Sequence, residues 1–252
     1  MNIQAANILT STPKKKSKSG QEGIPSVFTP LKTNRGFQDQ VILLLDVVEN
    51  TSKKVKKDKK DLLERLQQNN VNCEQRKLAV GDVMWILRKS TGEEFVLQWI
   101  VERKRMDDLS NSIIDKRYKE QKYRLSNCGV KNVFLLVEGS VRVHENQGRG
   151  LDANTLESAL FSSSYGTHSF LVKQTKNLED SLTFFMNMTK QIERLHRKLK
   201  EGKISKEQFM LDKTFDSFNS DSDKSKNLNV RDIFGKQLMQ MKGVSRFAWS
   251  CS

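Results

Sequence analysis

The sequence contains little cysteine and little histidine. Its three cysteines, Cys73, Cys128 and Cys251, are far apart and form no CxxC pair, which argues against a disulfide scaffold and a thiolate zinc site. The three histidines are too few and too scattered for a histidine-based metal site. No uninterrupted apolar run of about 18 residues occurs, and the N-terminus has no apolar signal core. We therefore expect a protein of a reducing compartment with no membrane span.

Basic residues outnumber acidic ones. The 252 residues include 44 Lys+Arg and 30 Asp+Glu, so the formal net charge is +14. Only 36% of the residues are apolar, which suits one domain of ordinary size with polar tails. Clustered Lys and Arg gain free energy by releasing counterions from phosphate backbones. The charge thus indicates nucleic acid or another acidic surface, without choosing between them.

Composition divides the chain into a body and polar ends. Residues 1–36 are polar, basic and rich in Ser and Thr, which predicts a disordered tail. Its Lys14–Lys18 patch is a nuclear-import signal or a solvated charge run. Residues 201–229 are polar again and predict a linker. Residues 230–252 carry one more helical period, which ends at Lys242-Gly-Val-Ser245.

Apolar runs alternate with amphipathic stretches over residues 37–200. Val41–Val48 is interrupted only by Asp46, which is typical of a strand covered on both faces. Val83–Val101 has two β-rich runs around a Ser-Thr-Gly turn and predicts a hairpin. The other expected elements are a lysine-rich loop over 53–60, helices over 61–69, 107–127, 152–164 and 177–200, and strands over 72–79, 133–137 and 169–173. This alternation predicts an α/β domain.

One segment joins an apolar strand to a helix and carries unlike charges at the junction: Trp99-Ile-Val-Glu102-Arg103-Lys104-Arg-Met-Asp-Asp108. Side chains alternate along a strand, so Glu102 and Lys104 project to one face and Arg103 to the other. Metal-dependent phosphodiester cleavage uses such a pair. The carboxylate holds Mg²⁺, and the lysine orients the attacking water or balances charge on the phosphate.

A hard divalent cation needs more oxygen ligands than Glu102 alone provides. Asp82 follows Gly81 and precedes the strand that pairs with the Glu102 strand. Asp46 lies in a buried apolar run, where an unpaired carboxylate costs several kcal/mol. Glu49 lies just beyond that run. A metal ion would satisfy these charges together.

Each of these residues also has an ordinary structural interpretation. Glu102–Lys104 is equally well a surface ion-pair cluster, and Asp46 a partner in a buried salt bridge. Asp82 can be a turn residue, and Asp108 is better explained as a helix cap than as a ligand. The basic face of the helix over 107–127 can be merely solvated. From the residues alone, both interpretations stay open.

The segment Glu102–Asp108 matches the ERKxxxD signature of the XPF-type structure-specific endonucleases, and its neighbours resemble the crossover-junction catalytic subunits of that family. The resembling segments are Arg76–Asp82, Ile113–Lys122 and Arg231–Gln240, within a match that runs from Val41 to Ser245. The resemblance implies a restriction-endonuclease-like nuclease domain over residues 37–200, with a central mixed sheet flanked by helices. It also implies incision of 3′ flaps, replication forks and nicked Holliday junctions in recombination and DNA repair, with Mg²⁺ as cofactor and Mn²⁺ as a substitute.

The resemblance also assigns roles to residues. The family's metal and active-site positions correspond to Asp46, Glu49, Asp82, Glu102 and Arg103, and Lys104 completes the motif. Arg103 would offer its backbone carbonyl to the metal and its side chain to a phosphate. Arg117, Gln121 and Lys122 belong to the helix beside the site, where contacts to the DNA backbone are expected.

Family members act in the nucleus as heterodimers with a non-catalytic partner, and they carry a tandem helix-hairpin-helix module. Residues 230–252 resemble a truncated start of that module, with a different sequence in place of the second helix. We therefore expect a C-terminally shortened form, with weakened partner binding. The alternative is a non-catalytic DNA-binding or scaffold subunit.

Overall fold

The computed structural model describes residues 38–47, 53–141, 150–165 and 169–223. Several predictions lie outside these residues. They are the disordered tail over 1–36 with its Lys14–Lys18 patch, Glu49, and the helix-hairpin-helix fragment over 230–252. No helix in the described ranges is long and apolar enough to cross a membrane.

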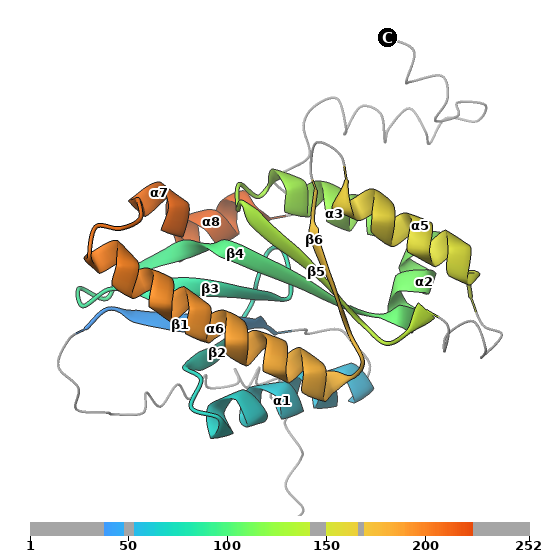
Figure 1. Ribbon diagram of the computed structural model, residues 1–252, viewed down its shortest axis with the longest axis horizontal. Helices are drawn as coiled ribbons and strands as arrows, with labels where there is room; N and C mark the ends of the chain where they lie inside the picture. Colours follow the sequence, from blue (N-terminus) through green and yellow to red (C-terminus); the bar gives the residue numbers. More distant parts are fainter. Residues whose placement is uncertain (1–37, 48–52, 142–149, 166–168, 224–252) are drawn as a thin grey trace, which may run out of the picture. The chain divides into compact units, whose positions relative to one another are not determined.

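A mixed seven-stranded sheet forms the centre of the fold (Figure 1). Its strands are β1 (Gln40–Asp46), β2 (Cys73–Arg76), β3 (Val83–Arg88), β4 (Glu94–Arg105), β5 (Asn132–Glu138), β6 (Leu171–Thr175) and β7 (Met210–Thr214). The spatial order is β2-β1-β3-β4-β5-β6, and β7 pairs with β4. The β1–β2, β4–β5 and β5–β6 pairs are parallel, and the other pairs are antiparallel. The predicted α/β fold, a mixed sheet flanked by helices, is confirmed.

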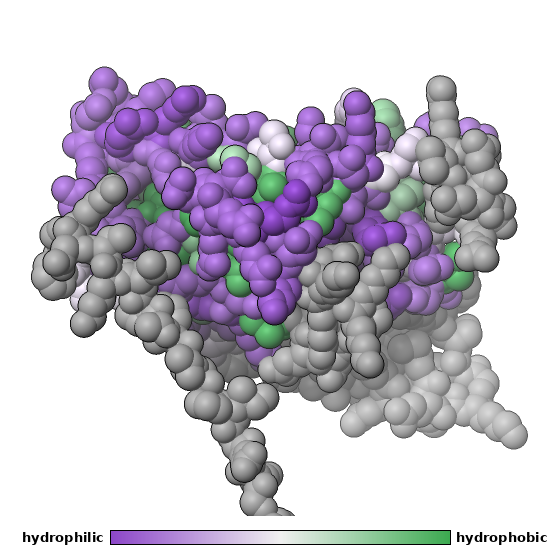
Figure 2. Space-filling model, turned by 90° about the horizontal axis from the view of Figure 1, so that it is seen from below, coloured by the Kyte–Doolittle hydropathy of each residue, from purple (hydrophilic) through white to green (hydrophobic). Residues whose placement is uncertain are grey.

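Helices cover both faces of this sheet. The core on one face includes residues of α2 (Met106–Ile114), α3 (Arg117–Asn127), α5 (Ala153–Ser164) and α8 (Phe215–Asp221). The core on the other face includes residues of α1 (Lys53–Gln68), α6 (Leu178–Lys200) and α7 (Lys206–Phe209). Viewed from below, where α1 lies in Figure 1, the molecule is mainly hydrophilic with scattered hydrophobic side chains (Figure 2). The strands β1, β3, β4 and β5 contain continuous apolar runs because both faces of the central sheet are buried.

The predicted hairpin is confirmed as the antiparallel pair β3–β4. Trp85 of β3 is fully buried, and its indole N–H donates to the Thr189 hydroxyl of α6 (2.9 Å). This bond satisfies the one polar group of a large apolar side chain, which is the usual requirement for a buried tryptophan. β4 continues to Arg105, so Glu102, Arg103 and Lys104 lie within the strand itself and not beyond its end.

One helix prediction and one loop prediction differ from the structure. The single helix expected over 107–127 is divided into α2 and α3 by Lys116, which adopts a left-handed conformation (φ 63°). Lysine in this conformation gives no sequence signal comparable to glycine or proline. The lysine-rich loop expected over 53–60 is instead the beginning of α1. Lysine is a good helix former, so a charge run does not by itself indicate a loop.

The linker predicted over 201–229 is wrong for residues 206–221, which form α7, β7 and α8. The buried side chains of Phe209, Met210, Phe215 and Phe218 attach these elements to both core layers. They stand among many polar residues, so the stretch resembles a linker in composition. The body of the fold therefore extends beyond residue 200.

Candidate nuclease active site

Three acidic residues lie in one row across β1, the start of β3, and β4. The Asp46 N–H donates to the Asp82 carbonyl (2.9 Å), and the Asp82 N–H donates to the Val101 carbonyl (2.9 Å). Glu102 follows Val101 in β4. Strand pairing therefore brings Asp46, Asp82 and Glu102, which are far apart in sequence, to the same end of three neighbouring strands. Alternation places Glu102 on the face covered by α2, α3 and α5.

The turn that delivers Asp82 into this row requires glycine. Gly81 has φ +74°, and a Cβ at this position would lie 2.7 Å from Cγ1 of Ile100. Any other residue would meet both a steric clash and a backbone conformation that L-residues disfavour. The Asp82 carboxylate then accepts the Arg103 N–H at Oδ2 (3.0 Å). Backbone geometry and this bond together fix the position of Asp82.

Two side chains that sequence reasoning missed support the loop before Asp82. The guanidinium of Arg124, from α3, donates to the carbonyls of Ala79 and Ser222. Asn219 of α8 accepts the Ala79 N–H (2.6 Å) and donates to the Lys77 carbonyl (3.2 Å). In the sequence, Arg124 belongs to a basic helix face and Asn219 to a polar stretch, so no pattern predicted that they support this loop.

Glu102 and Lys104 form a buried pair on the same face of β4, as alternation predicted. The Lys104 Nζ lies 3.6 Å from Glu102 Oε1, and the side chains are only 8% and 12% exposed. Lys104 also donates to the side-chain carbonyl of Gln121. Tyr118 lies nearby, and burial raises the pKa of its hydroxyl, with the Glu102 carboxylate raising it further. These contacts exclude the interpretation of Glu102–Lys104 as an exposed surface cluster.

Arg103 projects to the other face of β4, because side chains alternate along a strand, and there it bonds to Glu138, which also accepts from Ser181 of α6. The Nε and Nη2 of Arg103 both donate to Oε2 of Glu138 at the end of β5 (3.1 and 2.6 Å). Glu138 was not among the sequence candidates, because an acidic residue ending a strand is common and only the pairing of β4 with β5 reveals its partner. The end of β4 therefore carries charged groups on both faces of the sheet.

The oxygen donors in the row suit a hard divalent cation. Within the described residues, however, no group of three or more His, Cys, Asp and Glu side chains is arranged to hold a metal ion. Asp46 Oδ1 accepts the Leu78 N–H (2.9 Å), while Asp82 accepts the Arg103 N–H. Glu49, the fourth predicted ligand, lies outside the described residues. The metal site remains a prediction, based on the shared row and the oxygen chemistry of its members.

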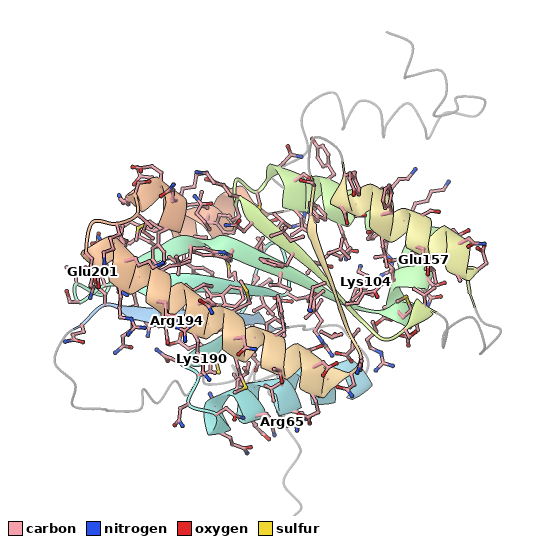
Figure 3. The ribbon with its side chains drawn as sticks, viewed as in Figure 1. Arg65, Lys104, Glu157, Lys190, Arg194 and Glu201 are labelled. Atoms are coloured by element: carbon pink, nitrogen blue, oxygen red, sulfur yellow. The ribbon has the colours of Figure 1, made fainter. Side chains whose placement is uncertain are left out.

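The three residues expected to contact DNA lie on α3 but do not share one surface. Arg117 is exposed and forms an ion pair with Asp115 (2.7 Å). Gln121 accepts the bond from Lys104, and Lys122 donates to the Ser163 hydroxyl of α5 (3.0 Å). Figure 3 shows Lys104 among side chains of the interior, near α5. The observed bonds of Gln121 and Lys122 thus join α3 to β4 and to α5.

Comparison with known proteins identifies the class. The ERCC4 domain model matches residues 46–188, which include the carboxylate row, the Glu102–Lys104 segment and α3, and the chain belongs to this family. Among curated relatives, the structure-specific endonuclease subunit MUS81 of Danio rerio is 34% identical over 233 residues, covering 81% of this chain and 38% of the relative. MUS81 of Homo sapiens is 34% identical over 205 residues, covering 73% of this chain and 36% of the relative.

A fungal relative and a solved structure are also similar to this chain. The crossover junction endonuclease mus81 of Aspergillus fumigatus is 31% identical over 238 residues, covering 81% of this chain and 39% of the relative. The structure of XPF from Aeropyrum pernix has a TM-score of 0.46 and 21% identity, covering 64% of this chain and 69% of that chain. This chain spans about two fifths of the length of the curated relatives it matches.

Proposed function

We propose that this chain is the catalytic part of a structure-specific DNA endonuclease that incises branched DNA in recombination and repair. The single observation that carries the proposal is the row formed by Asp46, Asp82 and Glu102. Acidic side chains on neighbouring strands repel one another, and carboxylate oxygens are the ligands that a hard divalent cation prefers. A function in cation binding and phosphate chemistry accounts for three of them in one row. The chain's family and the printed names of its relatives support the same function.

The proposed mechanism assigns separate tasks to the carboxylate row, to Lys104 and to α3. Asp46, Asp82 and Glu102, with Glu49 and the Arg103 carbonyl, would hold Mg²⁺ or Mn²⁺, which lowers the pKa of an attacking water and polarises the phosphate. Lys104 is held by Gln121 and lies 3.6 Å from Glu102, so its ammonium can orient that water or balance charge on the phosphate. On α3, Arg117 is an exposed cation that would bind the DNA backbone.

The test is cleavage of a labelled 3′-flap or fork in Mg²⁺ and in EDTA, by the chain with its partner subunit. In Asp82→Ala and Glu102→Ala the cleavage rate should fall at least about 100-fold, because removal of one group that stabilises the transition-state charge lowers a rate by about that factor. DNA affinity should stay within about twofold, since the phosphate contacts remain. Glu157→Gln, an exposed change on α5, is the matched control and should cleave normally. Unchanged cleavage by both alanine variants would refute the proposal.

Absence of cleavage by the parent protein would favour a different function. In that case the alternative, a non-catalytic DNA-binding or scaffold subunit, predicts fork binding with identical gel patterns in Mg²⁺ and EDTA. We also propose nuclear localisation, because the proposed substrate lies in the nucleus.

The second proposed partner, besides branched DNA, is a non-catalytic ERCC4-family subunit. An apolar surface defined by Phe161, Tyr165 and Leu171 supports it. Phe161 on α5 and Tyr165, the residue directly after α5, are each 64% exposed, and their ring centroids are 4.4 Å apart. Leu171 at the start of the edge strand β6 is 50% exposed. The Phe170 N–H donates to the Ser163 carbonyl (2.8 Å), which ties the strand's start to the end of α5. Clustered exposed aromatics are typical of protein-binding surfaces.

A further inference from the structure

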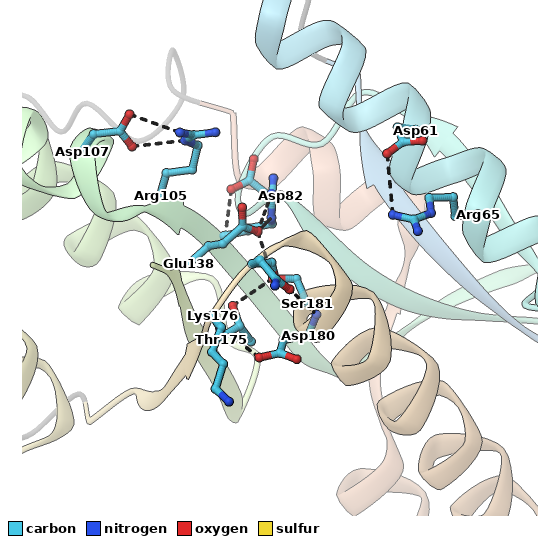
Figure 4. A network of polar contacts seen from close by, with 12 residues as sticks. Asp61, Arg65, Asp82, Arg105, Asp107, Glu138, Thr175, Lys176, Asp180 and Ser181 are labelled. Atoms are coloured by element: carbon cyan, nitrogen blue, oxygen red, sulfur yellow. Dashed lines mark hydrogen bonds and ion pairs between the residues drawn. The ribbon is translucent and has the colours of Figure 1, made fainter. Parts of the chain in front are cut away.

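A polar network on the α6 side of the sheet holds the side chain of Arg103 (Figure 4). Oε2 of Glu138 accepts two bonds from Arg103 and a third from the Ser181 hydroxyl of α6 (3.0 Å). The side chains of Arg103 and Glu138 are each only 11% exposed, so water screens their interaction weakly. Removing the charge of Glu138 would leave a nearly buried guanidinium without its anion.

Ser181 and Thr175 hold Glu138 in turn. The Ser181 hydroxyl has a single hydrogen, so when it donates to Glu138 it can only accept from the Thr175 hydroxyl, 2.9 Å away. Ser181 is fully buried and Thr175 is 5% exposed. The Asn177 carbonyl, at 3.2 Å, is the other acceptor within reach of the Ser181 hydrogen. When Ser181 donates to Glu138, the order of donation runs from Thr175 through Ser181 to Glu138, and this bond orients the carboxylate towards Arg103.

This network is connected to the proposed active site through the backbone of Arg103. The Arg103 N–H donates to Oδ2 of Asp82 (3.0 Å), while the Arg103 side chain is bound on the opposite face of the sheet. Rotation of β4 at Arg103 would move the donor that holds Asp82. It would also turn Glu102 and Lys104, which flank Arg103 in the same strand.

We propose that Glu138, oriented by Ser181, is a positioning residue that acts through Arg103 to hold Asp82 in place for phosphodiester cleavage. This inference rests on the proposed nuclease function. Glu138 lies on the α6 side and Glu102 on the α3 side, so Glu138 acts through the strand without contact to the carboxylate row. Partners of this kind, one bond removed from the reacting groups, typically change activity by about 10- to 100-fold when they are replaced.

The first experiment measures the position of Arg103 without metal or DNA. Nitrogen-15 NMR of the full chain should give a slowly exchanging Arg103 Nε–H signal, identified by its loss in Arg103→Lys. Glu138→Gln preserves size and an acceptor but removes the charge, so this signal should exchange about tenfold faster or more. In the control Glu157→Gln, the signal should match the parent. Equal exchange in Glu138→Gln and the parent would overturn the inference.

The second experiment measures function, as single-turnover flap cleavage in saturating Mg²⁺ by the chain with its partner. Glu138→Gln should slow cleavage by about 10- to 100-fold, while DNA affinity measured without metal stays within about twofold. Ser181→Ala should change the rate in the same direction by a smaller factor. Thr183→Ala is its matched control, because it removes an exposed hydroxyl from the same helix. A loss of affinity with an unchanged rate would overturn the positioning role.

The two measurements separate this inference from the function on which it rests. If the parent protein does not cleave, the proposed function fails, and the NMR result alone decides whether Glu138 positions Arg103. If the parent cleaves and Glu138→Gln cleaves equally fast, the inference fails and the proposed function stands.

Discussion

At the scale of single residues, Arg117 and Lys122 are both cations on α3, but their bonding partners differ. Arg117 is exposed and paired only across a short turn, whereas Lys122 is half-buried against α5. The Lys122 ammonium lies 5.6 Å from the ring centroid of Tyr118 and 5.9 Å from that of Phe170, and burial lowers its pKa. The two cations should therefore affect DNA binding and stability differently.

Arg117→Ala should weaken fork binding and lower the slope of log affinity against log salt by about 1, because one phosphate contact is lost. The measurement is a salt titration by fluorescence anisotropy. Lys190→Ala, an exposed change on α6, is the matched control and should retain the parent slope. A parent-like slope in Arg117→Ala would place the DNA elsewhere.

At the scale of secondary-structure elements, His196 of α6 links three segments near the end of the sheet. Its ring stacks on Phe209 (5.7 Å between centroids), and its Nε2 lies 3.9 Å from Asp39 Oδ2. Burial lowers the pKa of His196, and Lys200 lowers it further, while Asp39 opposes the shift. The contact with Asp39 resembles a salt bridge, but burial prevails because the ring is only about one tenth exposed. His196 is therefore predominantly neutral in the folded protein at neutral pH.

A lowered pKa in the folded state makes stability depend on pH in a defined direction. As the pH falls, His196 binds a proton near pH 6.5 in the unfolded chain and only at a lower pH in the folded chain. The contribution of neutral His196 to folding stability is therefore present above pH 6.5 and is lost as the pH falls through the lower folded pKa. Urea unfolding at pH 7 and pH 5 should therefore show a smaller loss of stability for His196→Gln than for the parent. An equal loss in both proteins would contradict this assignment.

Sequence reasoning succeeded at this scale where one local pattern decides the structure. The runs in β1, β3, β4 and β5 and the apolar stripe of α6 were recognised because strand and helix periods are visible within a few residues. The break at Lys116 has no local pattern that would predict it. The helix over 206–209 begins with a capping box formed by Ser205 and Gln208, but a single turn is too short to show a helical period. The charges of β4 singled it out as the strand of the candidate site, which stays a prediction, but Glu138 and Ser181 could be assigned only from the pairing of β4, β5 and α6.

At the scale of the whole molecule, the surface formed by Phe161, Tyr165 and Leu171 is the feature that the fold alone does not explain. Phe161→Ser combined with Tyr165→Ser should weaken binding of the partner's nuclease domain by about 30-fold or more, since aromatic hot spots contribute 2 kcal/mol or more. Isothermal titration calorimetry measures this change. Tyr123→Ser on α3 removes an aromatic side chain of similar exposure and should bind normally. Equal affinities for all variants would exclude this surface.

The pairing of β7 with β4 has a consequence for the order in which the molecule is made. β3 covers one edge of β4, while β5 and β7 share the other, with β5 pairing at residues 99–105 and β7 at residues 95–97. During synthesis, residues 95–97 must therefore wait for residues 210–214 to leave the ribosome. Until then the growing chain exposes an open backbone edge in its central strand, which is a template for pairing with other chains. That edge is covered only when β7 has been translated and pairs with β4.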